Sequence, residues 1–110
     1  MKQYVIDELR PADHAKLKAH LDERYAVSGF EGLYWIPINA ALLDGVQKTH
    51  EDCRPFYFAL ELSPGKMDCE LLVRSRQQIH CQCIQYATER QRNWLIDWID
   101  ALLGDLGISI

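Results

Sequence analysis

The most informative stretch of the sequence consists of two apolar segments joined by a short turn. It reads Pro55-Phe-Tyr-Phe-Ala-Leu-Glu-Leu62, then Ser63-Pro-Gly-Lys66, then Met67-Asp-Cys-Glu-Leu-Leu-Val73. Apolar residues alternate on both sides of a Pro-Gly turn, which is typical of two antiparallel strands. Proline presets φ at the first central position of a tight turn, and glycine tolerates the positive φ of the second. A slip by one residue would turn the apolar face toward solvent, so the register is strongly specified. The predicted facing pairs are Ser63–Lys66, Leu62–Met67, Leu60–Cys69, Phe58–Leu71 and Phe56–Val73.

A third strand is predicted after a reversal near residues 75–78, over Ile79-His-Cys-Gln-Cys-Ile-Gln-Tyr86. A loop with an odd number of residues places Ile79, Cys81 and Cys83 on the core face. An even loop would place the alternate residues there, namely His80, Gln82, Ile84 and Tyr86. We favour the odd loop because it buries three apolar groups and leaves the polar residues outside. Together the strands predict an antiparallel three-stranded meander over about 55–87.

The flanking segments predict helices and further strands. Residues 4–6 resemble a strand, and Pro11 suits the first turn of a helix over about 11–26. A strand over 33–38 lies at an edge or ends at Pro37, which cannot donate to a ladder. A short helix is predicted over about 40–49 with Leu42, Leu43 and Val46 on its apolar side, and a connecting loop over 50–54. Thr88 and Gln91 form a capping box for a helix over about 88–104. This order predicts a single α+β domain spanning 1–110.

Composition restricts the class of protein. The chain has 110 residues, 48% of them hydrophobic, and a net charge of −4. A chain of this size can bury a single core without cross-links. The acidic balance argues against nucleic-acid binding, and no apolar segment has the length needed to cross a membrane. The start of the chain does not resemble a signal peptide. We therefore expect a cytoplasmic protein that binds neither nucleic acid nor membrane.

Cysteine and histidine form the first candidate cluster. The four cysteines, at positions 53, 69, 81 and 83, are expected to be free thiols. The predicted register brings His50, Cys53 and His80 to one end of the sheet, where they could meet as soft-metal ligands. However, Cys81 and Cys83 are assigned to the core, and no C-x-x-C pair is present. We therefore predict packing of these cysteines, with no metal and no cofactor.

A basic cluster is the second candidate. Arginine pairs with carboxylates and phosphates through two parallel hydrogen bonds, so converging arginines could hold an anion. A cysteine beside them would have a lowered pKa and some thiolate character. The alternative is that these arginines are simply solvated. The predicted anion-binding residues are Arg54, Arg74, Arg76, His50 and His80, and the predicted reactive thiol is Cys53.

The outer face of the meander is the third candidate. Glu61 is predicted to lie opposite Asp68, with Glu70 nearby, so this face is either well hydrated or meets a basic partner. Aromatic and aliphatic residues on the same face indicate a contact surface, unless the short helix covers them. Trp94 and Trp98 widen the apolar stripe of the last helix, which suggests burial by a second subunit. The predicted interaction residues are Tyr57, Leu72, Ile84, Tyr86, Trp94 and Trp98.

No residue spacing favours a reaction class, so the sequence does not decide whether the protein is an enzyme. We expect a non-catalytic interaction module, resembling small adaptors or chaperones only in its size and charge, that binds a protein or peptide and forms a homodimer. The alternative is an anion-binding or thiol-dependent enzyme or sensor that uses the Arg/His/Cys cluster.

Overall fold

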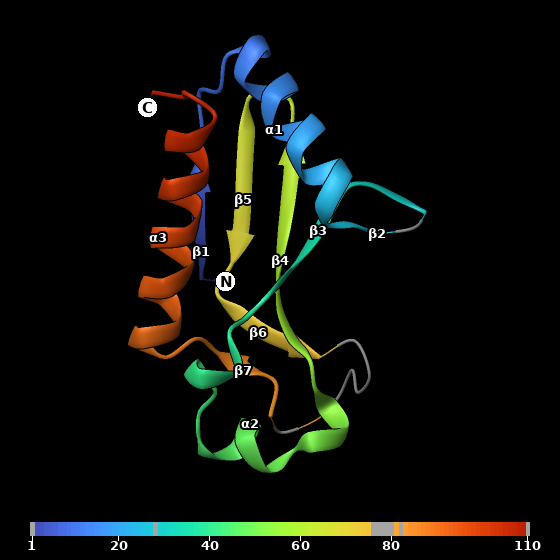
Figure 1. The fold of residues 1–110 in the computed structure, drawn as a ribbon, viewed down its shortest axis with the longest axis vertical. Helices are drawn as coiled ribbons and strands as arrows, with labels where there is room; N and C mark the ends of the chain where they lie inside the picture. Colours follow the sequence, from blue (N-terminus) through green and yellow to red (C-terminus); the bar gives the residue numbers. More distant parts are fainter. Residues whose placement is uncertain (1, 28, 76–80, 82, 110) are drawn as a thin grey trace.

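The computed structural model describes residues 2–27, 29–75, 81 and 83–109 (Figure 1). It confirms the α+β fold: within these residues, three α-helices and two 3-10 turns accompany a mostly antiparallel seven-stranded sheet. The strands are β1 Gln3–Ile6, β2 Ala26–Val27, β3 Phe30–Pro37, β4 Phe56–Ser63, β5 Lys66–Glu70, β6 Leu72–Ser75 and β7 Gln85–Tyr86. The helices are α1 Pro11–Arg24, α2 Gly45–Thr49 and α3 Glu89–Asp105, and the 3-10 turns are η1 Ala40–Leu42 and η2 Glu51–Cys53.

The predicted β4–β5 hairpin forms the centre of the sheet. The strand order is β1-β5-β4-β3-β2, and β6 pairs with both β4 and β7. Ser63 faces Lys66 across the turn, and the register of this hairpin is confirmed near the turn. Its two apolar pairs are Leu62–Met67 and Leu60–Cys69. The strong turn and the alternating apolar residues therefore determine this hairpin locally.

Beyond Glu70 the predicted register is wrong. Phe56 pairs with Ser75 instead of Val73, a shift of two residues. The cause lies at Leu71, whose backbone groups bond elsewhere: its N–H donates to the Lys2 carbonyl (3.0 Å) and its carbonyl accepts from the Ala87 N–H (2.7 Å). A shift of two preserves the face on which each side chain lies. Val73 is therefore still buried although its partner differs.

The predicted third strand is much shorter than expected. Of the described residues of this segment, only Gln85 and Tyr86 pair with β6, whereas Cys81, Cys83 and Ile84 are not in a strand. The Ile84 N–H donates to the Cys81 carbonyl (3.1 Å), so the chain turns here instead of extending. The other residues assigned to this region, namely Arg76, Gln77, Gln78, Ile79, His80 and Gln82, lie outside the described residues.

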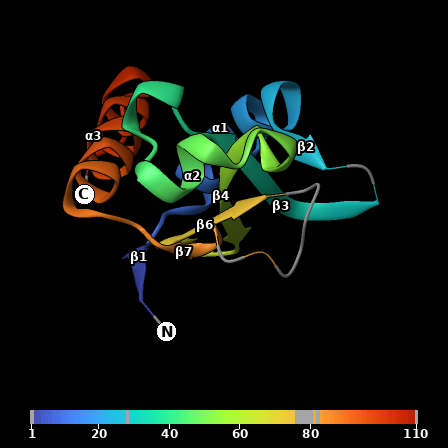
Figure 2. The same ribbon diagram turned by 90° about the horizontal axis from the view of Figure 1, so that it is seen from below.

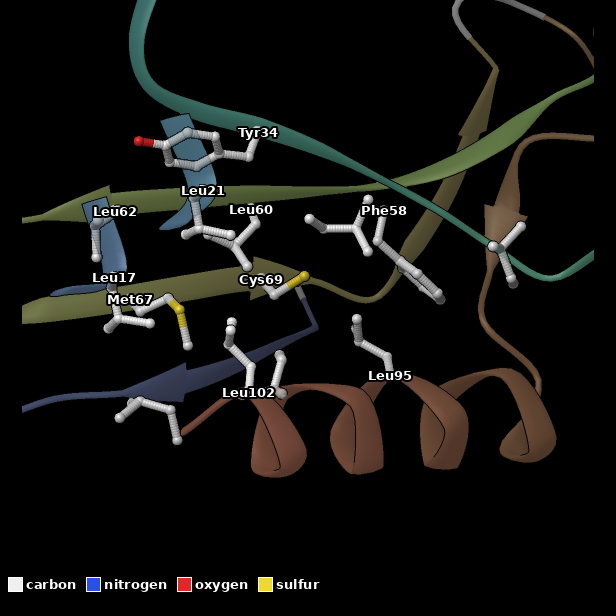
Figure 3. Packing of buried hydrophobic residues seen from close by; sticks show 14 of the residues in the cluster. Leu17, Leu21, Tyr34, Phe58, Leu60, Leu62, Met67, Cys69, Leu95 and Leu102 are labelled. Carbon is white, nitrogen blue, oxygen red and sulfur yellow. The ribbon is translucent and has the colours of Figure 1, made fainter. Parts of the chain in front are cut away.

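Both longer helices begin as predicted. Pro11 occupies the first turn of α1, and Thr88 caps α3 through a capping box with Gln91. Figure 2 shows the helices on one side of the sheet. Leu17 and Leu21 of α1 and Leu95 of α3 are fully buried against it. Apolar burial between these helices and one face of the sheet therefore forms the main core, part of which is drawn in Figure 3.

The predicted short helix over 40–49 is two elements, η1 and α2. Asp44 separates them because its side chain accepts from the Gln47 N–H (3.0 Å) and begins a new helix with a capping box. Val46 is 43% exposed, although it was assigned to the apolar side. The next residue of α2, Gln47, is fully buried although it is polar. The predicted loop over 50–54 contains the 3-10 turn η2.

The N-terminal strands extend the meander on both sides. β1 pairs with β5, and β3 pairs with β4 and ends at Pro37 as predicted. β3 begins earlier than expected, and the short β2 hairpin before it was not predicted. Gly32 allows the close approach of β3 to the turn of the central hairpin. Its φ is +78°, and a Cβ there would lie 2.7 Å from the Leu62 carbonyl oxygen.

Candidate functional site

The sheet face opposite the helices contains an apolar hollow at the β2–β3 end. In the described part of the chain, no helix lies over this face (Figure 2). Phe30 is 62% exposed there, more than the other exposed large hydrophobic residues that the structure describes, namely Val5, Val46 and Tyr86. The hollow has a volume of about 370 Å³. Its lining residues are Val27, Phe30, Leu33, Trp35, Arg74, Ser75 and Ile84.

A second hollow of about 360 Å³ adjoins the first and carries carboxylates. The two share Leu33, Trp35 and Arg74 in their linings. Glu61 faces Asp68 across β4 and β5, which confirms the predicted pairing. Like charges directly opposite each other are unfavourable, and a cation bound between them would relieve the repulsion. Lys66 already approaches Asp68 at 3.3 Å.

The predicted interaction residues do not form a single surface. Tyr57 packs edge-to-face on Trp35, with ring centroids 5.6 Å apart, and Ile84 lines the apolar hollow. Leu72 and Tyr86 form a cross-strand pair, and Tyr86 is 46% exposed. Both tryptophans of α3 lie on the helix side instead. There Trp94 stacks on Phe58 (6.3 Å) and Trp98 contacts Tyr25 (5.7 Å).

Among the described residues, the predicted basic cluster does not converge on one pocket. The Arg54 guanidinium donates to the Lys48 carbonyl (3.0 Å), whereas Arg74 forms a salt bridge with Glu70 on the outer face. Arg76 and His80 lie outside the described residues. Arg54 and Arg74 therefore contact different neighbours, Arg54 a backbone carbonyl and Arg74 a carboxylate.

Four side chains with metal-ligating atoms meet between the turn η2 and the segment before β7. They are His50, Cys53, Cys81 and Cys83, and their ligand atoms all lie within 4.8 Å of one another. His50 Nδ1 is 3.0 Å from Cys81 Sγ and 3.9 Å from Cys53 Sγ. Cys53 and Cys83 are buried, whereas His50 and Cys81 are partly exposed. Sequence reasoning brought His50 and Cys53 together and placed Cys81 and Cys83 in the core. Cys83 is indeed buried in the core, as is Cys53, whereas Cys81 is only partly buried against it.

The thiols of this cluster have contrasting pKa values. Hydrogen bonds from the Cys83 N–H and thiol, with smaller contributions from Cys53 and His50, lower the pKa of Cys81 to about 6. Burial raises the pKa of Cys83 to about 12 and also raises that of Cys53. The expectation of a lowered pKa at Cys53 is therefore wrong, because desolvation dominates there. The thiolate character belongs to Cys81.

A buried polar network holds the backbone beside the cluster. The Ser75 hydroxyl donates to the Cys53 carbonyl (2.6 Å), and the Gln47 side-chain amide donates to the Cys83 carbonyl (3.3 Å). Gln91 of α3 in turn donates to the Gln47 side-chain oxygen (2.8 Å). Gln47 and Gln91 are both fully buried. In the described residues, every buried side-chain nitrogen and oxygen has a hydrogen-bond partner.

Some of the candidate residues can be recognised from their spacing in the sequence, although the sequence analysis gave them a different role. The spacings His50-x-x-Cys53 and Cys81-x-Cys83 were visible, but an extended third strand assigned the second pair to the core. Phe30 was not among the predicted residues, because Gly29 and Gly32 on either side of it are typical of a loop and its exposure is visible only in the folded structure.

Comparisons with known proteins identify no relative. No protein-family model matches the chain, and no curated protein or solved structure matches it either. Among the described residues, none of the helices combines the length and the apolar character that crossing a membrane requires. Any functional conclusion therefore rests on the geometry of this chain alone.

Proposed function

We propose that this chain is a small non-catalytic binding module that holds a peptide segment of a partner protein on the outer face of its sheet. The observation that carries the proposal is the apolar hollow around the exposed Phe30, on a face over which none of the described helices lies. Exposed apolar patches on small proteins often mark sites of protein contact.

The two adjoining hollows define the chemistry of the bound segment. The apolar hollow suits one large aliphatic or aromatic side chain, because Leu33, Trp35 and Ile84 line it together with Phe30. The neighbouring hollow contains Glu61 and Asp68 and suits a lysine or arginine. We therefore expect an extended segment in which an apolar anchor stands close to a basic residue.

Selection from a displayed library of random peptides tests this proposal. The wild-type chain should enrich peptides that pair an apolar anchor with Lys or Arg. Phe30→Ser should weaken their binding by more than about tenfold, as expected for an anchoring aromatic contact. Glu61→Lys should also weaken binding and should reduce its dependence on salt. Val46→Ser is the matched control, because Val46 is an exposed apolar residue of α2, away from the hollow.

Two results would overturn the proposal. One is a selection without this enrichment, or peptides that bind Phe30→Ser as tightly as wild type. The other is a sedimentation coefficient that rises with protein concentration in wild type but not in Phe30→Ser. Such a result would mean that a second copy of the chain occupies the face. That second result would support the homodimer, which has less support here because Trp94 and Trp98 pack within their own chain.

A thiol-dependent activity is the second candidate function. Its support is the 3.0 Å contact between His50 Nδ1 and Cys81 Sγ, an imidazole–thiol pair at the wall of a surface hollow. Cys81, instead of Cys53, would then be the reactive thiol. Selective alkylation of Cys81 by iodoacetamide in the metal-free protein, lost in His50→Ala, would support this candidate.

We also place the protein in a reducing compartment such as the cytoplasm. The support is that all four cysteines are free thiols, although three of them lie close together. Thiols so close would be prone to oxidation in a secreted protein. Localisation of a tagged full-length chain by fractionation would check this assignment.

A further inference from the structure

Three thiols and one imidazole lie close together where two segments that are distant in the sequence meet. His50 immediately precedes the turn η2 and Cys53 is its last residue, whereas Cys81 and Cys83 precede β7. We propose that His50, Cys53, Cys81 and Cys83 bind one zinc ion as a structural Cys3His centre. This proposal is independent of the outer face and of any peptide bound there.

The distances fit a single tetrahedral ion. Zinc lies about 2.3 Å from sulfur and about 2.0–2.1 Å from nitrogen, so tetrahedral ligands stand roughly 3.6–3.8 Å apart. In this protein all the ligand atoms lie within 4.8 Å of one another, and two of the separations are 3.0 and 3.9 Å. Small movements of the side chains would therefore bring all four atoms to bonding distance.

The donor set indicates both the metal and its role. Soft thiolates with one imidazole suit zinc, whereas calcium and magnesium require oxygen ligands. Four protein ligands fill the tetrahedral coordination of zinc and leave no position for a reactive water. The site therefore has the chemistry of a structural centre instead of a catalytic one.

The surroundings of the cluster also fit a metal centre. The Ser75 hydroxyl and the Gln47 amide hold the carbonyls of Cys53 and Cys83, which fixes the backbone on each side of the site. Such outer contacts orient metal ligands in known metal centres. A surface hollow of about 470 Å³, lined by His50, Cys53 and Cys81, gives the ion a path from solvent.

Ordinary core packing explains the fourth cysteine but not this cluster. Cys69 is fully buried in the main core and behaves as a small hydrophobic residue. In contrast, Cys81 is partly exposed and contacts the ring of His50. Apolar packing of the buried Cys53 and Cys83 does not require a histidine and a partly exposed thiol beside them. A shared ion would cross-link η2 to the segment before β7.

Metal analysis of the full chain, purified under reducing conditions without chelator, tests the proposal. Native mass spectrometry should show one zinc ion per chain, and X-ray absorption should show three sulfur ligands and one nitrogen ligand. Replacement of zinc by Co²⁺ should give the visible bands of tetrahedral cobalt together with thiolate-to-cobalt charge transfer. A chelator should lower the melting temperature, because bound metal stabilises only the folded state.

Matched variants separate the cluster from the remaining thiol. Cys83→Ser and Cys81→Ser should lose the stoichiometric metal, whereas Cys69→Ala should keep it. The X-ray absorption of wild type decides the ligand set even if a cluster variant fails to fold.

Several results would overturn the proposal. A reduced wild-type chain that takes up neither zinc nor cobalt would do so, as would a spectrum with oxygen ligands. Equal metal binding by Cys69→Ala and Cys83→Ser would mean adventitious surface metal. A disulfide within the cluster that survives the reducing purification would assign these thiols to a covalent cross-link.

Discussion

Two regions of this molecule are stabilised in different ways. The helix-covered half consists of β1, β3, β4 and β5 with α1 and α3, and its buried side chains are almost all apolar (Figure 3). The polar end consists of η1, α2, η2, β6 and β7, at the bottom of Figure 1. Of the four buried polar side chains among the described residues, Gln47 and Ser75 lie in the polar end, and Gln91 reaches into it from α3.

This difference has a physical consequence. Apolar burial is non-directional and adds up over many contacts, so it tolerates small displacements. A buried hydrogen-bond network is directional, and the loss of one partner leaves the others unsatisfied. The polar end therefore depends on a few specific contacts, and it is also where the four metal-ligating side chains meet.

The largest effect is expected in the helix-covered half. Phe58 is fully buried and stacks on Trp94. Phe58→Ala should lower the free energy of unfolding by about 3–5 kcal/mol, because it removes apolar contacts and leaves a cavity. Urea denaturation measures this change. Tyr57→Ala is the control. The Tyr57 side chain lies next to Phe58 in β4 but on the opposite face of the sheet, and it is only half-buried. Its replacement should lower the free energy of unfolding by clearly less.

The next effect concerns the network of the polar end. Gln91 donates to the Leu42 carbonyl (2.9 Å) and to the Gln47 side chain, and it accepts from the Thr88 N–H. Gln91→Ala should cost about 1–3 kcal/mol, the penalty for buried groups left without partners. Hydrogen exchange should rise mainly in residues 40–49 and 83–88. Uniformly faster exchange throughout the sheet would contradict a separate polar end, and Asn93→Ala on the exposed side of α3 is the control.

A smaller effect is expected at the start of α3. The Thr88 hydroxyl accepts from the Gln91 N–H (3.2 Å) and caps the helix. Thr88→Ala should cost about 1 kcal/mol, whereas Thr88→Ser should cost much less because serine keeps the hydroxyl. Thermal and urea unfolding measure both variants. Equal losses in the two would mean that the methyl group, and not the cap, stabilises this end.

The smallest effect concerns a polar contact at the margin of the helix-covered half. The Tyr34 hydroxyl donates to Asp22 (2.6 Å). Lys18 and then Tyr34 lower the pKa of Asp22, so this contribution to stability is present above the usual carboxyl pKa and is lost as the pH falls. Tyr34→Phe should therefore destabilise the fold at neutral pH by less than Thr88→Ala does, and by less still near pH 3, because the exposed Asp22 is screened by solvent. A penalty that does not change with pH would contradict this assignment, and urea unfolding at both pH values measures it.

The sequence predicted the local elements well. The α+β class, the β4–β5 register near Pro64 and Gly65, and the capping box at Thr88 were all predicted and confirmed. Each of them depends on residues a few positions apart, through a turn, an alternation or a cap. One error began where distant segments intervened, because Leu71 bonds to Lys2 and Ala87. The break in the predicted short helix has a local cause instead, the capping box of Asp44 with Gln47, which the sequence prediction did not include.

The candidate sites show the same limit. The spacing of His50 and Cys53, the spacing of Cys81 and Cys83, and the pairing of Glu61 with Asp68 follow from local sequence. The 3.0 Å contact between His50 and Cys81, which are 31 positions apart, does not follow from local sequence and arises from the tertiary fold. The reason is that a local pattern specifies which face a side chain occupies within its own element. The path of the chain between elements depends on long-range contacts, such as those of Gln47 and Ser75 with the carbonyls beside the thiols.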